Sequence, residues 1–234
     1  MTAGPTARLH YFAGRGRAET TRWMLAATGI PFENLPLETP GALAALRSSG
    51  KLPFDQIPLL EIDGLCLSQS SALIRFLARR GNLYGDTPVE AMWCDMVAGA
   101  AADFAETAMQ AAFMATREEA LLALALRVSK FGPRFEDRLR SNETGYVAGE
   151  RLSFADVVLA QATHSYREIE VSLLSDYPLL SKHCELITKR PEISSYLKSA
   201  LCYPPPDDTY VISTARTLQR ALPAHMPDKD RFVV

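Results

Sequence analysis

The chain has 234 residues, of which 47% are hydrophobic and 22% charged, and this composition is typical of a globular protein with a hydrophobic core. Its formal net charge of −2 and its short apolar runs argue against a protein that binds nucleic acid or that binds or spans membranes. The N-terminus also lacks the apolar stretch of a signal peptide, so we expect a cytoplasmic protein.

Short strand-like runs alternate with helical segments in the first 85 residues. An apolar strand over 9–12 is followed by a helix over 17–29 and by a weaker strand over 32–38. The clearest signal is a hairpin over 57–69, because Asp63-Gly64 is a tight-turn pair between two apolar runs. An amphipathic helix over 70–81 then ends at a glycine.

The rest of the chain is predicted to be helical. Capping-box spacings begin three helices, at Thr87, Thr116 and Ser153, and the first of these helices is expected to run for about 25 residues. We expect Pro133 to bend or break the second helix. Shorter helices are predicted over 178–190, 191–200 and 208–221. The predicted organisation is an α/β unit over 1–85, an all-helical domain over 86–222 and a polar tail over 223–234 that frays.

The four cysteines lie far apart, without the spacing of metal ligands. They are Cys66, Cys94, Cys184 and Cys202. We expect free thiols in a reducing compartment, without disulfides and without a metal site.

The loop between the first strand and the first helix carries an unusual pair of arginines. Arg15 and Arg17 stand at a helix N-terminus, which favours anions, so we expect something negative to lie between them. The loop has neither the Walker pattern nor the third glycine of a dinucleotide fingerprint. Tyr11 ends the strand, and its hydroxyl could donate to an anion over the helix. If that anion is a thiolate, its pKa would fall from about 8.5 toward neutrality. The alternative is that Tyr11 is an ordinary half-buried strand aromatic.

Two further positions are typical of peptide binding. The Ile57-Pro58 bond at the entry of a strand is a candidate for the cis form, which would leave the backbone of Ile57 free to pair with an extended peptide. Ser70 begins a helix, where its hydroxyl and N–H would hold a carboxylate. The alternative for Ser70 is a plain N-cap, which is compatible with that role.

Together these segments resemble the cytosolic glutathione transferases, and more closely their alpha class. The resemblance covers about residues 7–222 and is carried, in order, by YFAGRGRAE, LPFDQIPLLEIDG, LSQSSALIRFLA, NLYG, LSFADV and PPPDDTYV. It implies an α/β thioredoxin-like N-terminal domain, an all-α C-terminal domain and a homodimer.

The resemblance also assigns roles by position. Tyr11 corresponds to the thiol-activating tyrosine and Arg17 to the arginine beside the glutathione sulfur. The other residues expected to bind glutathione within the same subunit are Arg47, Gln56, Ile57, Pro58, Gln69 and Ser70. Arg47 and Gln56 would lie at the glycine end, Ile57 would pair with the cysteinyl moiety, and Gln69 and Ser70 would hold the γ-glutamyl group.

Three residues are expected to act across the subunit interface. Asp103 matches an acidic residue that reaches the glutathione amine of the other subunit. Lys130 stands where alpha-class proteins usually have an arginine, and it keeps the charge without the bidentate fork. Phe54 matches an aromatic that docks into the partner's helical domain, and the alternative is an ordinary core phenylalanine.

The electrophile is expected to bind between the first loop, the long helix and the last helix. The candidate pocket residues are Phe12, Ala13, Met109, Gln110, Phe113, Tyr210, Val211, Thr214 and Leu218. We hypothesise that the Tyr210 hydroxyl hydrogen-bonds an enal carbonyl, and the alternative is that Tyr210 only packs a lid.

The resemblance therefore implies a detoxification enzyme that conjugates glutathione, its co-substrate, to hydrophobic electrophiles such as aryl halides and hydroxyalkenals. Glutathione peroxidase or ketosteroid isomerase activity is expected beside it. The alternative is a non-catalytic carrier of hydrophobic ligands, or a structural protein of the same fold. A thiol oxidoreductase is nearly excluded, because the first helix has no cysteine at its start.

Overall fold

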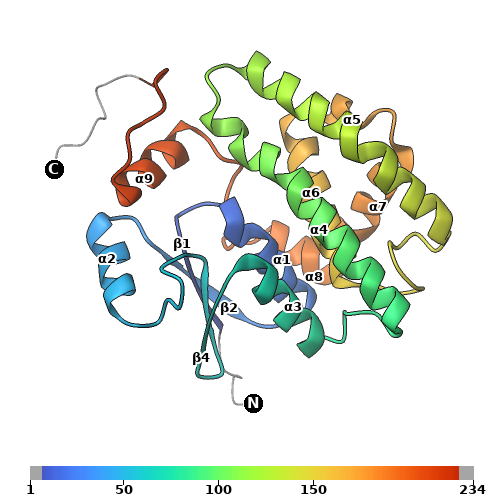
Figure 1. The fold of residues 1–234 in the computed structure, drawn as a ribbon, viewed down its shortest axis with the longest axis horizontal. Helices are drawn as coiled ribbons and strands as arrows, with labels where there is room; N and C mark the ends of the chain where they lie inside the picture. Colours follow the sequence, from blue (N-terminus) through green and yellow to red (C-terminus); the bar gives the residue numbers. More distant parts are fainter. Residues whose placement is uncertain (1–6, 227–234) are drawn as a thin grey trace.

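The computed structural model describes residues 7–226 and has two parts, a small mixed sheet with helices on both faces and a helical bundle (Figure 1). The first part contains β1 (Ala7–Tyr11), α1 (Glu19–Ala27), β2 (Phe32–Pro36), α2 (Pro40–Ser48), β3 (Leu59–Ile62), β4 (Leu65–Ser68) and α3 (Ser70–Arg80). The strand order is β2-β1-β3-β4, with β1 parallel to β2 and antiparallel to β3. The predicted α/β unit, including its hairpin, is confirmed.

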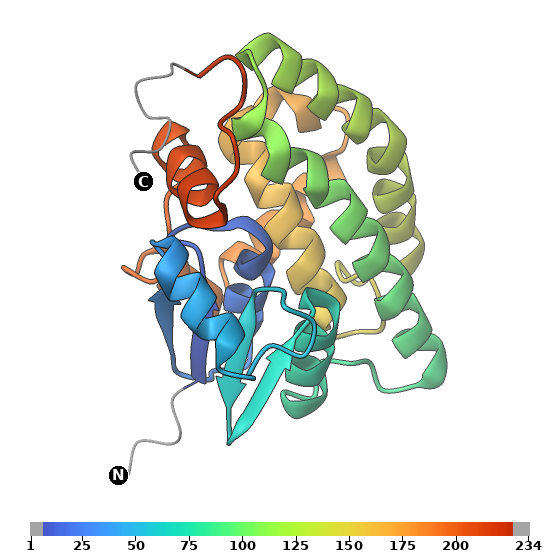
Figure 2. The same ribbon diagram turned by 60° about the vertical axis from the view of Figure 1, so that its left-hand side comes forward.

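Helices α1 and α3 lie on the face of the sheet that is turned toward the bundle, and α2 covers the opposite face beside α9 (Figures 1 and 2). The alternation of β3 explains this arrangement, because neighbouring strand residues point to opposite faces. Leu60 packs into the large core shared with the bundle, while Leu59 packs against Leu43 and Leu46 of α2.

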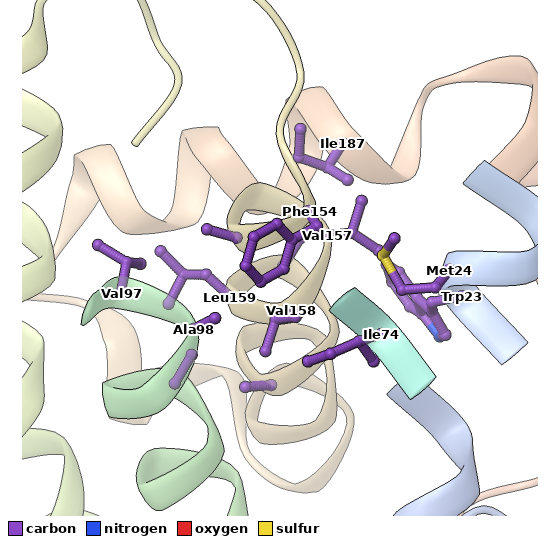
Figure 3. Packing of buried hydrophobic residues seen from close by; sticks show 14 of the residues in the cluster. Trp23, Met24, Ile74, Val97, Ala98, Phe154, Val157, Val158, Leu159 and Ile187 are labelled. Atoms are coloured by element: carbon purple, nitrogen blue, oxygen red, sulfur yellow. The ribbon is translucent and has the colours of Figure 1, made fainter. Parts of the chain in front are cut away.

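The bundle contains α4 (Pro88–Gln110), α5 (Arg117–Asn142), α6 (Phe154–Ile169), α7 (Pro178–Thr188), α8 (Pro191–Leu197) and α9 (Asp208–Leu218). Short 3-10 turns lie at Gly16–Ala18, Ala111–Phe113 and Val171–Leu174. Helix α6 runs through the middle. Figure 3 shows Phe154, Val157, Val158 and Leu159 of α6 beside residues of α1, α3, α4 and α7. One hydrophobic core therefore joins both parts.

The expectation that Pro133 breaks its helix is wrong, because α5 continues from Arg117 to Asn142 with the proline inside. A bend of the helix at Pro133 stays a prediction. Packing holds the helix together on both sides of the proline. A Cβ on Gly132 would lie 2.7 Å from the ring of Tyr177, so the two elements are in close contact. The Glu136 carboxylate, one turn later, accepts hydrogen bonds from the backbone N–H groups of Leu179 and Leu180 in α7, both at 2.9 Å. These tertiary contacts outweigh the loss of one helical hydrogen bond.

The last helix ends earlier than predicted, at Leu218, and the chain after it packs back. Gln219 adopts a left-handed conformation with φ +52°. Leu222 and Met226 are buried against Val211 and Ala215 of α9. The first residues of the predicted polar tail are thus part of the packed structure, and residues 227–234 lie outside the described part of the chain.

Candidate active site

Tyr11 lies at the end of β1, at the junction between the sheet and the start of α1. Its side chain is 6% exposed, and its hydroxyl accepts a hydrogen bond of 3.0 Å from the backbone N–H of Arg17. Burial raises the pKa of the Tyr11 phenol, while the N–H and the guanidinium of Arg17 lower it. With a raised pKa the phenol keeps its proton at neutral pH, and it can donate that proton in a hydrogen bond to an anion.

The two arginines of the loop are matched by carboxylates of the helical bundle, which corrects the expectation of one anion between them. Arg17 donates to both oxygens of Glu106 on α4, at 3.0 and 3.1 Å. Arg15 is paired with Glu168 on α6 and donates to the carbonyl of Tyr203 at 2.7 Å. Because these partners are 89 and 153 residues away from the arginines, no local pattern reveals them.

A buried ionic network connects the loop between β1 and α1 to the neighbouring helices. Glu19 accepts hydrogen bonds from Arg22 at 3.0 Å, from the Trp23 indole at 3.1 Å and from the Tyr196 hydroxyl at 2.8 Å. Arg22 also donates to the carbonyl of Arg15 at 3.2 Å. Each buried charge has a partner of opposite sign and further hydrogen bonds, as buried ions require. The network ties the loop to α1 and α8.

Tyr210 of α9 lies over the same loop, and two glycines give it room. A Cβ on Gly14 would lie 2.2 Å from the Tyr210 ring. Gly16 has φ +42°, and a Cβ there would lie 2.6 Å from the Tyr11 hydroxyl and 2.7 Å from the Tyr210 hydroxyl. Burial and the neighbouring Tyr11 raise the pKa of Tyr210. The protonated hydroxyls of Tyr11 and Tyr210 therefore both lie next to Gly16.

A cavity of about 400 Å³ opens beside the two phenols. Seven of the predicted pocket residues line it, namely Phe12, Met109, Gln110, Phe113, Tyr210, Thr214 and Leu218. Ala13 and Val211 do not. Val211 follows Tyr210 by one position, about 100° around the helix, and is buried against Leu222 and Met226 instead. Sequence reasoning missed the part of the wall that follows α9, which includes Arg220, Leu222 and Pro223.

Some of the residues expected to bind glutathione contact one another or the loop after β1. The Ile57-Pro58 bond is cis, as the sequence predicts. Gln69, with φ +70°, donates from its amide to the Gln56 side chain at 2.8 Å. Ser70 is the first residue of α3, and its hydroxyl donates to the carbonyl of Arg17 at 3.3 Å. The N-cap position of α3 belongs to Gln69, so the interpretation of Ser70 as a plain N-cap is wrong.

The remaining expected residues lie on the surface. Arg47 is exposed in the last turn of α2, and Asp103 is exposed on α4. Lys130 is exposed on α5, with its ammonium 5.1 Å from the centre of the Phe131 ring. Phe54 is 65% exposed, which contradicts the alternative of a core phenylalanine.

Comparison with known proteins identifies the family. The glutathione S-transferase N-terminal domain matches residues 7–79, and the C-terminal domain of the same family matches residues 102–200. Rat glutathione S-transferase alpha-4 is 37% identical over 214 residues, which cover 90% of this chain and 96% of the relative. The chain belongs to the glutathione S-transferase family. Human glutathione S-transferase A1 is 36% identical over 216 residues, covering 91% of this transferase and 97% of the relative.

Solved structures agree with this assignment. The glutathione S-transferase from Ascaris lumbricoides superimposes with a TM-score of 0.72 at 30% identity, covering 82% of this transferase and 96% of that chain. Na-GST-3 from Necator americanus, described as monomeric, has a TM-score of 0.74 at 25% identity, covering 83% and 97%. The predicted family and fold class are confirmed, and the protein is an enzyme of the transferase class whose family uses glutathione as co-substrate.

No helix within residues 7–226 is long and apolar enough to cross a membrane. In the same part of the chain, no group of three or more His, Cys, Asp or Glu side chains is placed to hold a metal ion.

Proposed function

We propose that this transferase joins the sulfur of glutathione to hydrophobic electrophiles, including aryl halides and enals such as hydroxyalkenals. The observation that carries the proposal is the position of the Tyr11 hydroxyl, between the first N–H groups of a helix and a largely apolar pocket. A thiolate held there would accept a hydrogen bond from Tyr11 and would lie near the positive charge of Arg17. Both interactions favour the ionised thiol.

The tripeptide would lie along the edge of the sheet. The γ-glutamyl end would be bound by Gln69 and Ser70, where α3 begins and its free N–H groups attract a carboxylate. The cysteinyl backbone would pair with Ile57, followed by Pro58. Arg47 and Gln56 would bind the glycine end. Asp103 of the partner subunit and Lys130 of the partner subunit would complete the site from across the dimer interface.

The chemistry follows from this arrangement. The thiol releases its proton to solvent, and the sulfur then attacks the β-carbon of an enal. A carbon–sulfur bond forms, and the electrons of the double bond move toward the carbonyl oxygen. We propose that Tyr210 donates a hydrogen bond to that oxygen, because its hydroxyl lies beside that of Tyr11. Protonation of the α-carbon by solvent completes the addition. With an aryl halide the same attack expels halide.

The test is the Tyr11→Phe variant. Without the phenol hydrogen bond, we expect the pKa of bound glutathione to return toward about 8.5, and each unit of that rise costs about tenfold in thiolate at neutral pH. Turnover of an aryl halide, an enal, a hydroperoxide and a ketosteroid would be measured beside an ultraviolet titration of the bound thiol. The last two substrates also test the peroxidase and isomerase activities that we propose.

A matched control separates this effect from the loss of any tyrosine hydroxyl. Tyr146→Phe removes a hydroxyl from the loop after α5, and we expect unchanged rates in that variant. Equal rates in wild type and Tyr11→Phe on every substrate would contradict the mechanism. Absence of turnover in the wild type on every substrate would leave ligand carriage as the function.

We also infer a homodimer. Phe54 projects from the loop before β3, and Met92 and Met96 of α4 are likewise exposed apolar side chains. Burial of these side chains between two copies would be favourable. Since a relative is described as monomeric, the oligomeric state needs its own measurement. Phe54→Ala should shift sedimentation toward the monomer, and an unchanged sedimentation coefficient would contradict the assigned role of Phe54.

A cytoplasmic location completes the proposal. All four cysteines are free, and Cys94 and Cys184 are buried. Free thiols are the usual state of cysteine in the reducing cytosol. Fractionation of the cells that express the protein would test the location.

A further inference from the structure

The electrophile pocket has a graded polarity. At its inner end lie the hydroxyls of Tyr11 and Tyr210, whose side chains are 6% and 9% exposed. Its apolar lining includes Phe12, Met109 and Phe113. Arg220 also lines the pocket and is exposed, so it belongs to the rim. The pocket therefore presents hydrogen-bond donors inside, apolar walls and a cation at the mouth.

The charge of the pocket is positive. Among residues 7–226, the charged side chains that line it are Arg17 and Arg220. The Arg17 guanidinium is paired with the carboxylate of Glu106 at 3.0 and 3.1 Å, so part of its charge is compensated. Arg220 contributes its charge from the segment after the end of α9.

The position of Arg220 is built into the fold. After α9 the chain reverses at Gln219 and runs back along the helix (Figure 2). The backbone N–H of Arg220 donates to the carbonyl of Ala215 at 2.9 Å. Two residues later, Leu222 is buried against Val211 and Ala215. These contacts hold the backbone of Arg220 at the pocket, and its side chain is exposed there.

We propose that this transferase prefers amphipathic electrophiles, apolar enals or enones that carry a carboxylate, and that Arg220 binds the carboxylate at the mouth of the pocket. The inference rests on the proposed conjugation reaction and names its substrate class. A guanidinium is suited to this role, because its planar fork can bind both oxygens of a carboxylate. The apolar chain then spans the walls, and the reactive double bond reaches the sulfur at the inner end.

The carboxylate takes no part in bond making. The sulfur bonds to the β-carbon, the electrons of the double bond pass to the carbonyl oxygen, and solvent protonates the α-carbon. No group leaves, and the ion pair with Arg220 persists from substrate to product. Arg220 is therefore a specificity-determining residue, and its effect is expected in the choice between charged and neutral substrates.

The experiment compares two forms of one alkenal, a chain that ends in a free carboxylate and the methyl ester of the same chain. For each enzyme the quantity measured is the ratio of kcat/KM for the acid to kcat/KM for the ester. This ratio cancels any general effect of a substitution on the fold or on the thiol. Because the rim is exposed, we expect the wild type to prefer the acid by about two- to fivefold at low salt.

Three variants and a salt series complete the design. Arg220→Gln should bring the ratio to one, and Arg220→Lys should keep part of the preference, since lysine keeps the charge but not the fork. Arg216→Gln is the matched control, because Arg216 is exposed on α9 and is not among the lining residues. Its ratio should equal that of the wild type. Raising the salt concentration should lower the wild-type ratio.

The outcomes distinguish this inference from the proposed function. If the wild type turns over the aryl halide and the ester but shows no preference for the acid, the inference is wrong and the conjugation reaction stands. A preference that survives in Arg220→Gln also overturns it. If the wild type conjugates none of these electrophiles, the proposed function itself fails.

Discussion

Among the single residues, two glycines in the loop after β1 allow the phenol groups of Tyr11 and Tyr210 to lie close together. Gly14 lies under the Tyr210 ring, and Gly16 lies under the hydroxyls of both Tyr11 and Tyr210. Any side chain at either position would have to displace an aromatic ring. The glycines of this loop therefore serve the approach of α9 rather than the binding of a phosphate, which is the usual role of glycines between a strand and a helix.

The Gly14→Ala variant tests this account. Its Cβ would lie 2.2 Å from the Tyr210 ring, so the ring must move away from Tyr11. We expect kcat/KM for a hydroxyalkenal to fall about threefold to tenfold, the value of one neutral hydrogen bond, and Tyr210→Phe to show a similar loss. The measurement compares this substrate with an aryl halide, whose attack needs no donor to a carbonyl. Gly99→Ala is the control, since a Cβ on Gly99 meets nothing within 4 Å. Retention of enal turnover in both Gly14→Ala and Tyr210→Phe would assign Tyr210 to packing alone.

A second prediction concerns Glu106. Its carboxylate offsets the charge of Arg17, which lies beside the expected position of the sulfur. Glu106→Gln should therefore lower the pKa of bound glutathione, because more positive charge then faces the thiolate. The Arg17 and Glu106 side chains are 55% and 34% exposed, so the expected decrease is modest, about 0.2–0.7 pKa units. Ultraviolet titration of the complex measures it, with Glu118→Gln on the exposed start of α5 as the control. A rise in the pKa would contradict the assigned role of Glu106.

Among the helices, the start of α6 combines a local capping box with contacts to residues outside the helix. The Asp156 carboxylate accepts a hydrogen bond from the Ser153 N–H at 2.8 Å, and the Asp156 N–H donates to the Ser153 hydroxyl oxygen at 3.4 Å, which together form the predicted capping box. The Ser153 hydroxyl also donates to the carboxylate at 2.6 Å. The same carboxylate accepts from the backbone N–H of Val147 at 2.7 Å and lies 3.0 Å from the Nε2 of His183. One buried carboxylate thus connects α6, the loop after α5 and α7, and these contacts support the predicted structural role.

Asp156→Ala should therefore cost much more than the loss of an ordinary cap. Several buried donors would lose their acceptor, and we expect the free energy of unfolding to fall by about 3–5 kcal/mol. Thr116→Ala removes an exposed cap at the start of α5 and should cost only about 1 kcal/mol. Urea unfolding of both variants provides the comparison. Equal losses would show that the contacts with Val147 and His183 contribute nothing to stability.

At the scale of the whole molecule, buried tyrosines connect the two domains. The Tyr196 hydroxyl of α8 donates to Glu19 of α1, and Tyr210 of α9 lies over the loop after β1. Burial is the largest cause of the raised pKa values of Tyr11, Tyr166, Tyr196 and Tyr210. Tyr166 lies inside the bundle, where its hydroxyl donates to the carbonyl of Phe104 at 2.9 Å. The other three lie between the two domains, so the interface depends on phenols that remain protonated.

These shifts predict a loss of stability in alkaline solution. In the unfolded chain tyrosines ionise near pH 10, whereas in the folded chain the same groups keep their protons to higher pH. Their contribution is therefore complete below about pH 10 and declines as the pH rises above it. Urea unfolding between about pH 8 and pH 11 would measure the decline. Tyr196→Phe should make the dependence on pH shallower, and an unchanged slope in that variant would contradict this explanation.

The local elements and the family can be predicted from the amino-acid sequence alone. Hairpin turns, caps and hydrophobic periodicity are properties of neighbouring residues, and they placed the strands and most helix starts within a few positions. The motif resemblance assigned expected roles in glutathione binding to Tyr11, Gln56, Gln69 and Ser70, and these roles stay predictions. The structure places Gln56 beside Gln69 and Ser70 beside Arg17.

Other features follow from contacts between segments that are distant in the sequence, and only the tertiary structure shows them. It kept α5 continuous through Pro133, turned Val211 away from the pocket and packed Leu222 against α9. It also supplied Glu106 and Glu168 as the partners of the two loop arginines. The physical reason is the same in each case. The stability of a proline within a helix, of a buried helix face or of a charged group depends on the groups that surround it in space. These groups come from parts of the chain that local sequence patterns do not connect.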